Sequence, residues 1–158
     1  MAKPIAPCLW FDSNAEEAVK FYCSIFKDSE IVAIDRYTEL GPGPEGSIMF
    51  IEFMLNGQDF QAINGGPEFT FSEAISLSVV CADQEEVDYY WDTLLAGGGK
   101  PSQCGWLTDR FGLSWQVYPA VLNEMIRDSD RVKANKALKA MFQMVKFDVA
   151  QLQKAYDG

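Results

Sequence analysis

Apolar and polar residues recur with two different periods along this chain, and each period predicts a type of element. Steps of three and four residues are typical of amphipathic helices. Two such helices are expected, and each begins at a capping-box pattern, Ser13-x-x-Glu16 in the first and Asp83-x-x-Glu86 in the second. Their apolar positions are Ala15, Ala18, Val19, Tyr22, Ile25 and Phe26 in the first helix, and Val87, Tyr90, Trp91, Leu94 and Leu95 in the second.

Alternation with a period of two predicts strands around these helices. Asn56-Gly57 is typical of a tight hairpin turn, and Asp109-Arg110-Phe111-Gly112 predicts a second turn near the end of the strand region. A helical stripe from Asn135 to Val145 and a last short helix capped by Asp148 follow the strands. The expected strands cover residues 4–11, 31–38, 47–55, 60–64, 75–81, 105–108 and 113–118.

The succession of strand, helix and strands occurs twice, at an offset of 69 residues that places Asn14 on Asp83 and Tyr22 on Trp91. This internal repeat predicts an α+β fold of two matched modules, with a ligand site at their junction. We expect a first module over residues 1–70, a shortened second module over 71–126, and a helical tail over 127–158.

The net charge of -10 argues against a nucleic-acid-binding protein, which needs a basic face. No apolar run approaches the ~20 residues that span a bilayer, and no signal-peptide pattern is seen at the start. We therefore expect a cytoplasmic protein without membrane partners. The tail carries a net charge of +3 and the rest of the chain -13. Such a tail would dock onto the acidic body or a partner subunit, or it is a solvated basic face.

The chain contains no histidine, which excludes Ser-His-Asp and Cys-His catalysis and every imidazole metal site. Its four cysteines form no Cys-x-x-Cys pair, so no zinc knuckle is predicted. Cys104 lies in a loop beside aromatic residues, and it is either an idle thiol or a reactive nucleophile with Asp109 or Tyr118 in proton transfer. No Gly-x-Gly-x-x-Gly follows a strand, so no nucleotide or S-adenosylmethionine site of the Rossmann kind is predicted.

The last expected strand separates two kinds of side chain. Trp115 and Val117 are predicted to point one way, while Ser114, Gln116 and Tyr118 point the other way. One interpretation is an apolar face against a helix and a polar face beside a ligand cavity. The alternative is that Trp115 is a core residue, Gln116 is solvated and Trp106 fills the space between the modules.

The motif Asp-x-Asn-Ala-Glu-Glu-Ala-x-x-Phe-Tyr at residues 12–22, with Phe26 and Asp109-Arg110-Phe111-Gly112-x-Ser114-Trp115, resembles the PhnB-like family. Members of that family are often called 3-demethylubiquinone-9 3-methyltransferases. The family belongs to the vicinal-oxygen-chelate superfamily, which includes glyoxalase I, extradiol dioxygenases and bleomycin-resistance proteins. The resemblance covers about residues 4–120 and implies paired βαβββ modules, usually in a homodimer.

In metal-using relatives the ligands lie on the first and last strands of each module, which the resemblance places here at Pro7 or Cys8, Gln61, Ser76 and Gln116. Amide and hydroxyl groups are poor substitutes for imidazole and carboxylate, so we expect no metal and no other cofactor. The predicted function is binding of an unidentified small organic molecule, with a metal-independent Cys104 enzyme as the alternative. The expected ligand-binding residues are Trp10, Gln61, Ser78, Trp106 and Gln116.

Overall fold

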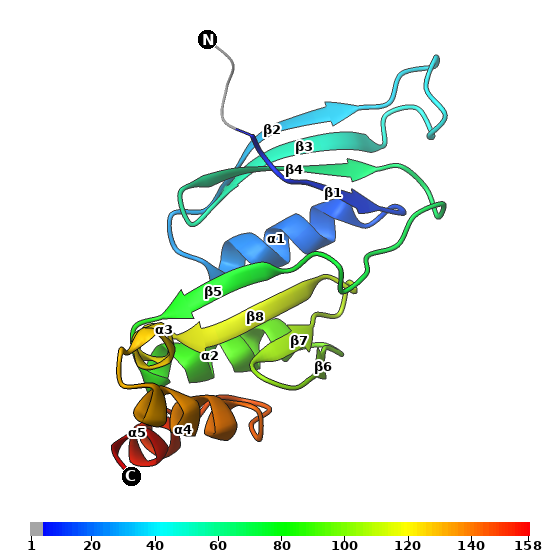
Figure 1. Ribbon diagram of the computed structural model, residues 1–158. Coiled ribbons are helices and arrows are strands. Elements are labelled where there is room, and N and C mark those ends of the chain that lie inside the picture. Colours follow the sequence, from blue (N-terminus) through cyan, green and yellow to red (C-terminus); the bar gives the residue numbers. More distant parts are fainter. Residues whose placement is uncertain (1–4) are drawn as a thin grey trace. The chain divides into compact units, whose positions relative to one another are not determined.

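The computed structural model describes residues 5–158, which form two compact units that divide between Phe71 and Ser72 (Figure 1). Each unit contains one four-stranded sheet and one helix that packs on it, and the second unit ends in three more helices. None of the helices within residues 5–158 is long and apolar enough to cross a membrane. The predicted α+β fold of paired βαβββ modules with C-terminal helices is confirmed.

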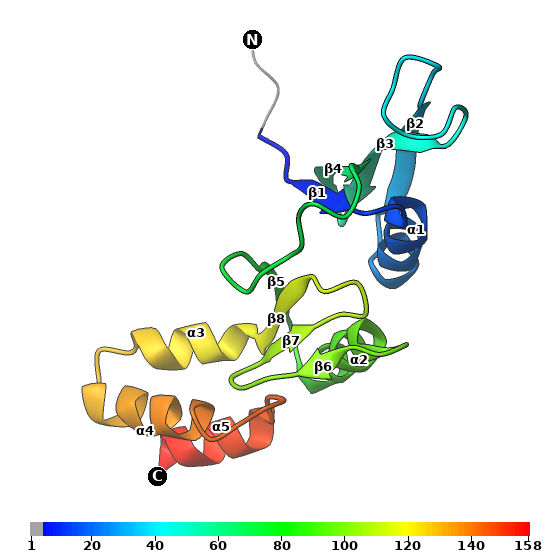
Figure 2. The same cartoon turned by 90° about the vertical axis from the view of Figure 1, so that its right-hand side faces the viewer.

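Sheet A of the first unit has the strand order β1-β4-β3-β2. Its strands are β1 (Cys8–Phe11), β2 (Glu30–Arg36), β3 (Ile48–Leu55) and β4 (Gln58–Asn64), and its helix is α1 (Ala15–Ile25). Strands β1 and β4 run parallel, and the other neighbours are antiparallel. Figure 2 shows α1 along one face of this sheet, where its apolar stripe is buried against β3 and β4.

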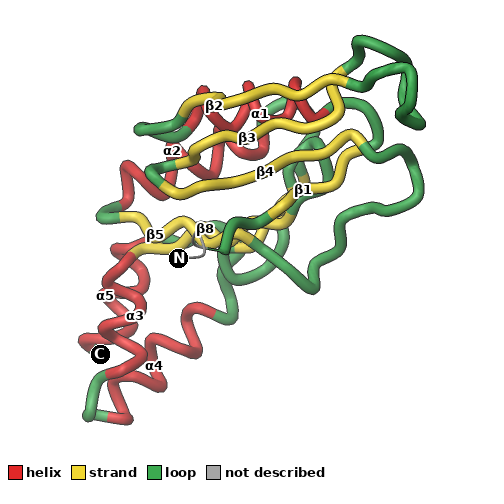
Figure 3. Tube along the Cα trace, turned by 90° about the horizontal axis from the view of Figure 1, so that it is seen from above, coloured by secondary structure: helices red, strands yellow, loops and turns green. Residues whose placement is uncertain are grey.

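Sheet B of the second unit has the corresponding order β5-β8-β7-β6, again with one parallel pair, β5 and β8. Helix α2 packs on one face of this sheet. Helix α3 follows the last strand of this sheet, and α4 and α5 lie in the tail, all three labelled in Figure 3. The elements are β5 (Leu77–Cys81), α2 (Gln84–Leu95), β6 (Lys100–Pro101), β7 (Trp106–Thr108), β8 (Ser114–Pro119), α3 (Ala120–Arg127), α4 (Arg131–Met141) and α5 (Val149–Asp157).

Two helix beginnings differ in how they are capped. At α2, Asp83 accepts a hydrogen bond from the Glu86 backbone N–H at 3.0 Å, as the capping pattern predicts. At α1 the predicted Ser13 box does not form, because Asn14 occupies the cap position and makes no side-chain cap bond. The Oδ1 of Asn64, at the end of β4, instead accepts from the Ala15 N–H at 2.9 Å. A residue distant in sequence thus replaces the local cap.

The observed bounds of several other elements also differ from the expected ones. The helical stripe expected at 135–145 forms α4, which begins and ends four residues earlier, at Arg131 and Met141. Helix α3 over Ala120–Arg127 was not predicted; its eight residues follow directly on strand β8 without a loop. The strand expected over residues 4–11 is observed over Cys8–Phe11, and residue 4 lies outside the described residues.

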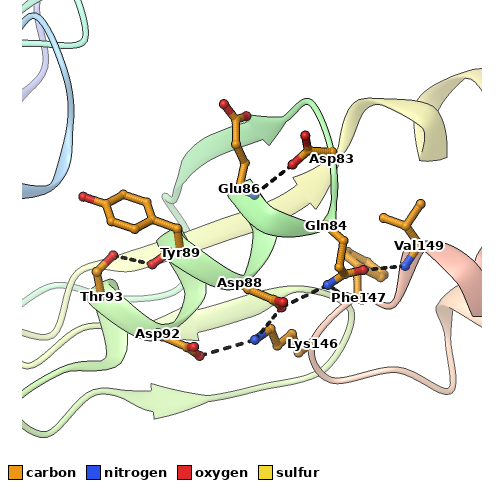
Figure 4. A network of polar contacts seen from close by, with 10 residues as sticks. All are labelled: Asp83, Gln84, Glu86, Asp88, Tyr89, Asp92, Thr93, Lys146, Phe147 and Val149. Atoms are coloured by element: carbon orange, nitrogen blue, oxygen red, sulfur yellow. Dashed lines mark hydrogen bonds and ion pairs between the residues drawn. The ribbon is translucent and has the colours of Figure 1, made fainter.

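The segment between α4 and α5 is held onto α2 by a cluster of polar contacts, drawn in Figure 4. The Gln84 amide donates to the Phe147 carbonyl at 3.1 Å and accepts from the Val149 N–H at 2.7 Å. The ammonium of Lys146 pairs with Asp88 at 2.7 Å and with Asp92 at 3.3 Å. The basic tail is therefore bound to acidic residues of its own unit.

The Lys146 contacts make a small, pH-dependent contribution to stability. The hydrogen bond from Lys146 lowers the pKa of Asp88; burial lowers the pKa of Lys146, but its bonds with Asp88 and Asp92 raise it overall. We expect Lys146→Ala to cost less than about 1 kcal/mol at neutral pH, because these groups are partly exposed. The loss should shrink below pH ~4 as Asp88 is protonated and above pH ~10 as Lys146 is deprotonated. Urea unfolding at three pH values measures it. Lys139→Ala on α4 is the control, and an equal, pH-independent loss in both variants would contradict this account.

Candidate functional site

Sheet B has an apolar face and a polar face. Leu107, Trp115 and Val117 are buried on the side of α2. The opposite face carries Gln116, with Ser78 and Trp106 as its register partners on the neighbouring strands. The predicted alternation along β8 holds from Trp115 to Tyr118, whereas Ser114 at its start is buried, and three of the expected ligand-binding residues lie side by side.

A hydrogen bond fixes the amide at the centre of this polar face. The Nε2 of Gln116 donates to the Ser76 hydroxyl at 2.8 Å, which orients the Gln116 side chain. Tyr118 lies two residues further along β8 on the same face and is half-buried. Hydrogen-bonding groups beside an indole are suited to a small organic molecule that has both an aromatic and a polar part.

Sheet A carries the other two expected ligand-binding residues on the face away from α1. Gln61 of β4 is the register partner of Cys8 on β1 and of Glu52 on β3. Glu52, Asp59 and Gln61 line a cavity of about 230 Å³. Trp10 lies on the same side of β1 as Cys8, and its indole N–H donates to the Gly66 carbonyl at 2.9 Å.

Glu52 is a further polar residue on this face that was not predicted from the sequence. It is the only charged residue in β3, Ile-Met-Phe-Ile-Glu-Phe-Met-Leu, and a carboxylate within an apolar strand is the signal that could have identified it. Its register beside Gln61 adds an acidic group to a face that was expected to offer only amide and aromatic side chains. A ligand at this face would therefore meet a hydrogen-bond acceptor that carries a negative charge.

The positions that the resemblance aligns with metal ligands form two pairs in this chain, Pro7 or Cys8 with Gln61, and Ser76 with Gln116. Cys8 is the register partner of Gln61, and Ser76 is hydrogen-bonded to Gln116. The Gln116 amide already donates to the Ser76 hydroxyl, and an amide beside a hydroxyl does not provide the imidazole and carboxylate donors that zinc or manganese prefers. Ser76 and Gln116 are therefore a poor pair of ligands for a divalent transition metal. Within residues 5–158, no three His, Cys, Asp or Glu side chains are grouped so that they could hold a metal ion.

Asp109, a candidate for proton transfer, anchors the turn between β7 and β8. Its side chain is buried, with Oδ1 accepting from the backbone N–H groups of Phe111 at 2.8 Å and Leu113 at 3.1 Å. Its Oδ2 accepts from the indole N–H of Trp115 at 2.8 Å. The observed contacts of this carboxylate are structural, and they orient the tryptophan on the core side of β8.

Cys104, the candidate nucleophile, lies beside the tail segment and adopts a positive φ of 56°. Its backbone N–H donates to the Met144 carbonyl at 2.8 Å, and its thiol donates to the Met141 carbonyl at 3.6 Å. The thiol is half-buried, and the strand pairing of β7 with β8 begins only at Trp106. The structure thus places Cys104 at the C-terminal end of α4 and outside the paired strands β7 and β8, which carry Trp106 and Gln116.

The four cysteines are free thiols, and their environments predict different reactivities. Burial, together with the nearby negative charges of Glu86 and Asp83, raises the pKa of the Cys81 thiol to about 12. Since the thiolate is the nucleophile, we expect Cys81 to remain unmodified by iodoacetamide at pH 8 while the protein is folded. Peptide mass spectrometry after labelling measures this, with labelling in urea as the control. Rapid labelling of Cys81 in the folded protein would contradict the prediction.

Comparison with solved structures supports the same architecture. The PhnB protein of Bacillus cereus is 41% identical and aligns over 75% of this chain and 100% of its own, with a TM-score of 0.68. A Pseudomonas aeruginosa protein, 22% identical, aligns over 75% and 98% with a TM-score of 0.61. The fosfomycin-resistance protein FosX of Listeria monocytogenes, solved with Mn(II) and sulfate, is 14% identical over 80% and 97%, with a TM-score of 0.55. The fold is that of the vicinal-oxygen-chelate superfamily.

The family within that superfamily follows from the sequence match. The model of the family described as 3-demethylubiquinone-9 3-methyltransferase matches residues 3–118. This chain therefore belongs to that PhnB-like family. A search of the curated proteins finds no match. Helices α3, α4 and α5 lie beyond the matched residues.

Proposed function

We propose that this protein binds a small organic molecule on the polar faces of its sheets and that it does so without a metal. The observation that carries the proposal is the face of sheet B, where the Gln116 amide is oriented by Ser76 and flanked by Ser78 and Trp106. Aromatic surface supplies burial, and an oriented amide supplies directional hydrogen bonds. On the face of sheet A, Trp10 and Gln61 offer an aromatic and an amide side chain of the same kinds.

Binding is favoured over methyl transfer for this chain. The family's description names a methyltransferase, but the glycine-rich fingerprint of a Rossmann cofactor site does not follow any expected strand. Binding is also favoured over metal chemistry of the kind that the Mn(II) complex of FosX suggests, because Gln116 and Ser76 are neutral and already bonded to each other. We further propose a cytoplasmic homodimer, in keeping with four free thiols and with the family resemblance.

A thermal-shift screen tests the proposal with divalent metals, a chelator and a library of small aromatic and antibiotic-like compounds. A compound at 100 times its dissociation constant should add about 2.7 kcal/mol of stability, and each kcal/mol should raise the midpoint by roughly 2–4 °C. We expect Gln116→Ala and Trp106→Ala to weaken binding of any compound found. The exposed residues Gln143 and Phe142 provide matched controls, Gln143→Ala and Phe142→Ala.

Two outcomes would contradict the proposal. Stabilisation by a metal that the chelator reverses would show that a metal site is present. Unchanged affinity in both Gln116→Ala and Trp106→Ala would show that sheet B does not carry the site. Analytical ultracentrifugation of the free protein tests the dimer separately, and a mass near the 17.7 kDa of one chain would exclude it.

A further inference from the structure

A second cavity, of about 530 Å³, lies at one end of sheet A and is formed only by residues of the first unit. Its walls are the residues that follow β1 and β4, the first turn of α1, and the segment 36–48 that connects β2 to β3. Its volume is in the range of small-molecule pockets. Neither Trp10 nor Gln61 lines it, so it is a different space from the polar face of sheet A.

One wall is built around the ring of Tyr37. The Tyr37 hydroxyl donates to the Asn64 carbonyl at 2.6 Å, and the residue is 9% exposed. Gly41 and Gly43 approach the ring so closely that a Cβ at either would lie 2.5 or 2.4 Å from a ring atom. The connecting segment thus wraps around a fixed aromatic ring, and only glycine allows this approach. The wall is formed before any ligand arrives.

Another part of the lining, Gly65 and Gly66, is fixed to the end of β1 and to the residue after it. The backbone N–H of Gly65 donates to the Phe11 carbonyl at 2.9 Å, and that of Gly66 donates to the Asp12 carbonyl at 3.1 Å. The Trp10 indole holds the Gly66 carbonyl from the other side, at 2.9 Å. A cavity with hydrogen-bonded walls loses little conformational entropy on binding, which favours affinity for small ligands.

The charges that line the cavity are of both signs. Arg36 donates one N–H to the Gly46 carbonyl at 2.9 Å, which holds a guanidinium with five donors at the cavity. Asp12 and Glu16 supply carboxylates to the same cavity. A hydrogen bond and the charge of Lys20 lower the pKa of Glu16, and the charge of Arg36 adds to this. Glu16 is therefore ionised at neutral pH. A bound ligand would meet its negative charge together with the positive charge of Arg36.

We propose that this cavity binds a small zwitterion, with its carboxylate at Arg36 and its ammonium group at Asp12 and Glu16. A purely anionic ligand would meet two carboxylates, and a purely cationic ligand would meet the guanidinium, whereas a zwitterion places an opposite charge at each. The Tyr37 ring and Pro42 add apolar surface to the same lining. Free α-amino acids and short peptides share this chemistry.

The test is a titration of the ¹⁵N-labelled full chain, followed by amide chemical shifts. The probes are L-phenylalanine and L-alanyl-L-phenylalanine, which separate a free amino acid from a peptide, together with N-acetylphenylalanine and phenylalaninamide, which each retain one charge. We expect saturable shifts for at least one of the two zwitterions at residues 12–16, 36–47 and 64–66. The single-charge probes should bind more weakly. Absence of shifts in these three segments with both zwitterions would overturn the proposal.

Substitutions of two charged residues of the lining, the exposed Arg36 and the half-buried Glu16, show which end of the ligand each one binds. Arg36→Gln should weaken zwitterion binding by roughly tenfold or more and should abolish the response to N-acetylphenylalanine. Glu16→Gln should weaken zwitterion binding and abolish the response to phenylalaninamide. Glu85, in the first turn of α2, is the matched control for Glu16, and Arg127 is the control for Arg36. Zwitterion affinity unchanged by Arg36→Gln and by Glu16→Gln would also overturn the proposal.

The result is independent of the proposed function at the sheet faces. Shifts at residues 12–16, 36–47 and 64–66 report this cavity, whereas shifts at Ser78, Trp106 and Gln116 report the face of sheet B. A zwitterion that shifted only Ser78, Trp106 and Gln116 would contradict zwitterion binding in the cavity beside Tyr37. It would leave the proposed site on sheet B in place.

Discussion

Gly105→Ala is expected to lower the free energy of unfolding by about 3 kcal/mol or more, because it combines a strained backbone with overpacking. Gly105 is buried and has a φ of +77°, a conformation that L-residues with a Cβ rarely adopt. A Cβ there would lie 2.4 Å from Cε2 of Phe147 and 2.6 Å from the Val117 carbonyl oxygen. The Gly105 N–H donates to Val145 and its carbonyl accepts from Val117, both at 2.8 Å, so the backbone cannot move away freely.

Gly57 provides a matched control for this substitution. It has the same φ of +77°, and a Cβ built on it would have no neighbour within 4 Å. Gly57→Ala should therefore lose only the backbone contribution, on the order of 1–2 kcal/mol. Urea unfolding of the two variants separates backbone strain from the clash with Phe147. Equal losses in the two variants would show that the tail segment around Phe147 is not packed tightly against Gly105.

Asp109→Ala is expected to cost about 3–5 kcal/mol, because it leaves three hydrogen-bond donors without their carboxylate. Those donors are the backbone N–H groups of Phe111 and Leu113 and the indole N–H of Trp115. The exposed cap residue Asp83, which accepts one bond from Glu86, is the comparison, and Asp83→Ala should cost about 1 kcal/mol. A loss below that of Asp83→Ala would contradict the anchoring role.

A double-mutant cycle measures how much the hydrogen bond between Asp109 and the Trp115 indole contributes to this loss of stability. Asp109→Asn can still accept from the backbone through its amide oxygen, but its NH₂ group would face the Trp115 N–H, and two donors cannot bond to each other. We expect Asp109→Asn to be less destabilising in a Trp115→Phe background than in the wild type, because the conflicting N–H is then absent. Additive losses would show that the two side chains are not coupled. A large loss of stability in Asp109→Ala would also give a structural explanation for any loss of ligand binding in that variant.

Part of the candidate site could be predicted from the sequence. The alternation along β8 placed Trp115 and Val117 on one face and Gln116 and Tyr118 on the other, as observed. The resemblance aligned Gln61 and Ser76, but their partners required the strand register, which sets Glu52 beside Gln61 and brings Ser76 to Gln116. Strand pairing depends on contacts between residues far apart in the chain, and a periodic pattern does not contain them.

The cavity lined by Tyr37, Arg36 and Glu16 also could not be predicted from the sequence. The glycine- and proline-rich segment 41–46 lies between the strands expected at 31–38 and 47–55, and its composition by itself indicates only a loop. Its function as a wall depends on Tyr37, whose hydroxyl bonds to Asn64 on another strand. The Asn64 side chain also caps α1, in place of the local Ser13 pattern. Each of these contacts joins residues more than 25 positions apart.

The sequence by itself determined the two amphipathic helices, the hairpin turn at Asn56-Gly57, the Asp83 and Asp148 caps and the α+β fold, because periodicity, capping and turn preferences act over a few residues. Only the tertiary structure decided that Asp109 anchors a turn, that Lys146 binds Asp88, and that Arg36 shares a cavity with Glu16. These roles arise when the chain brings distant charges and donors within a few ångströms of each other, where burial and Coulomb attraction determine what each group can do.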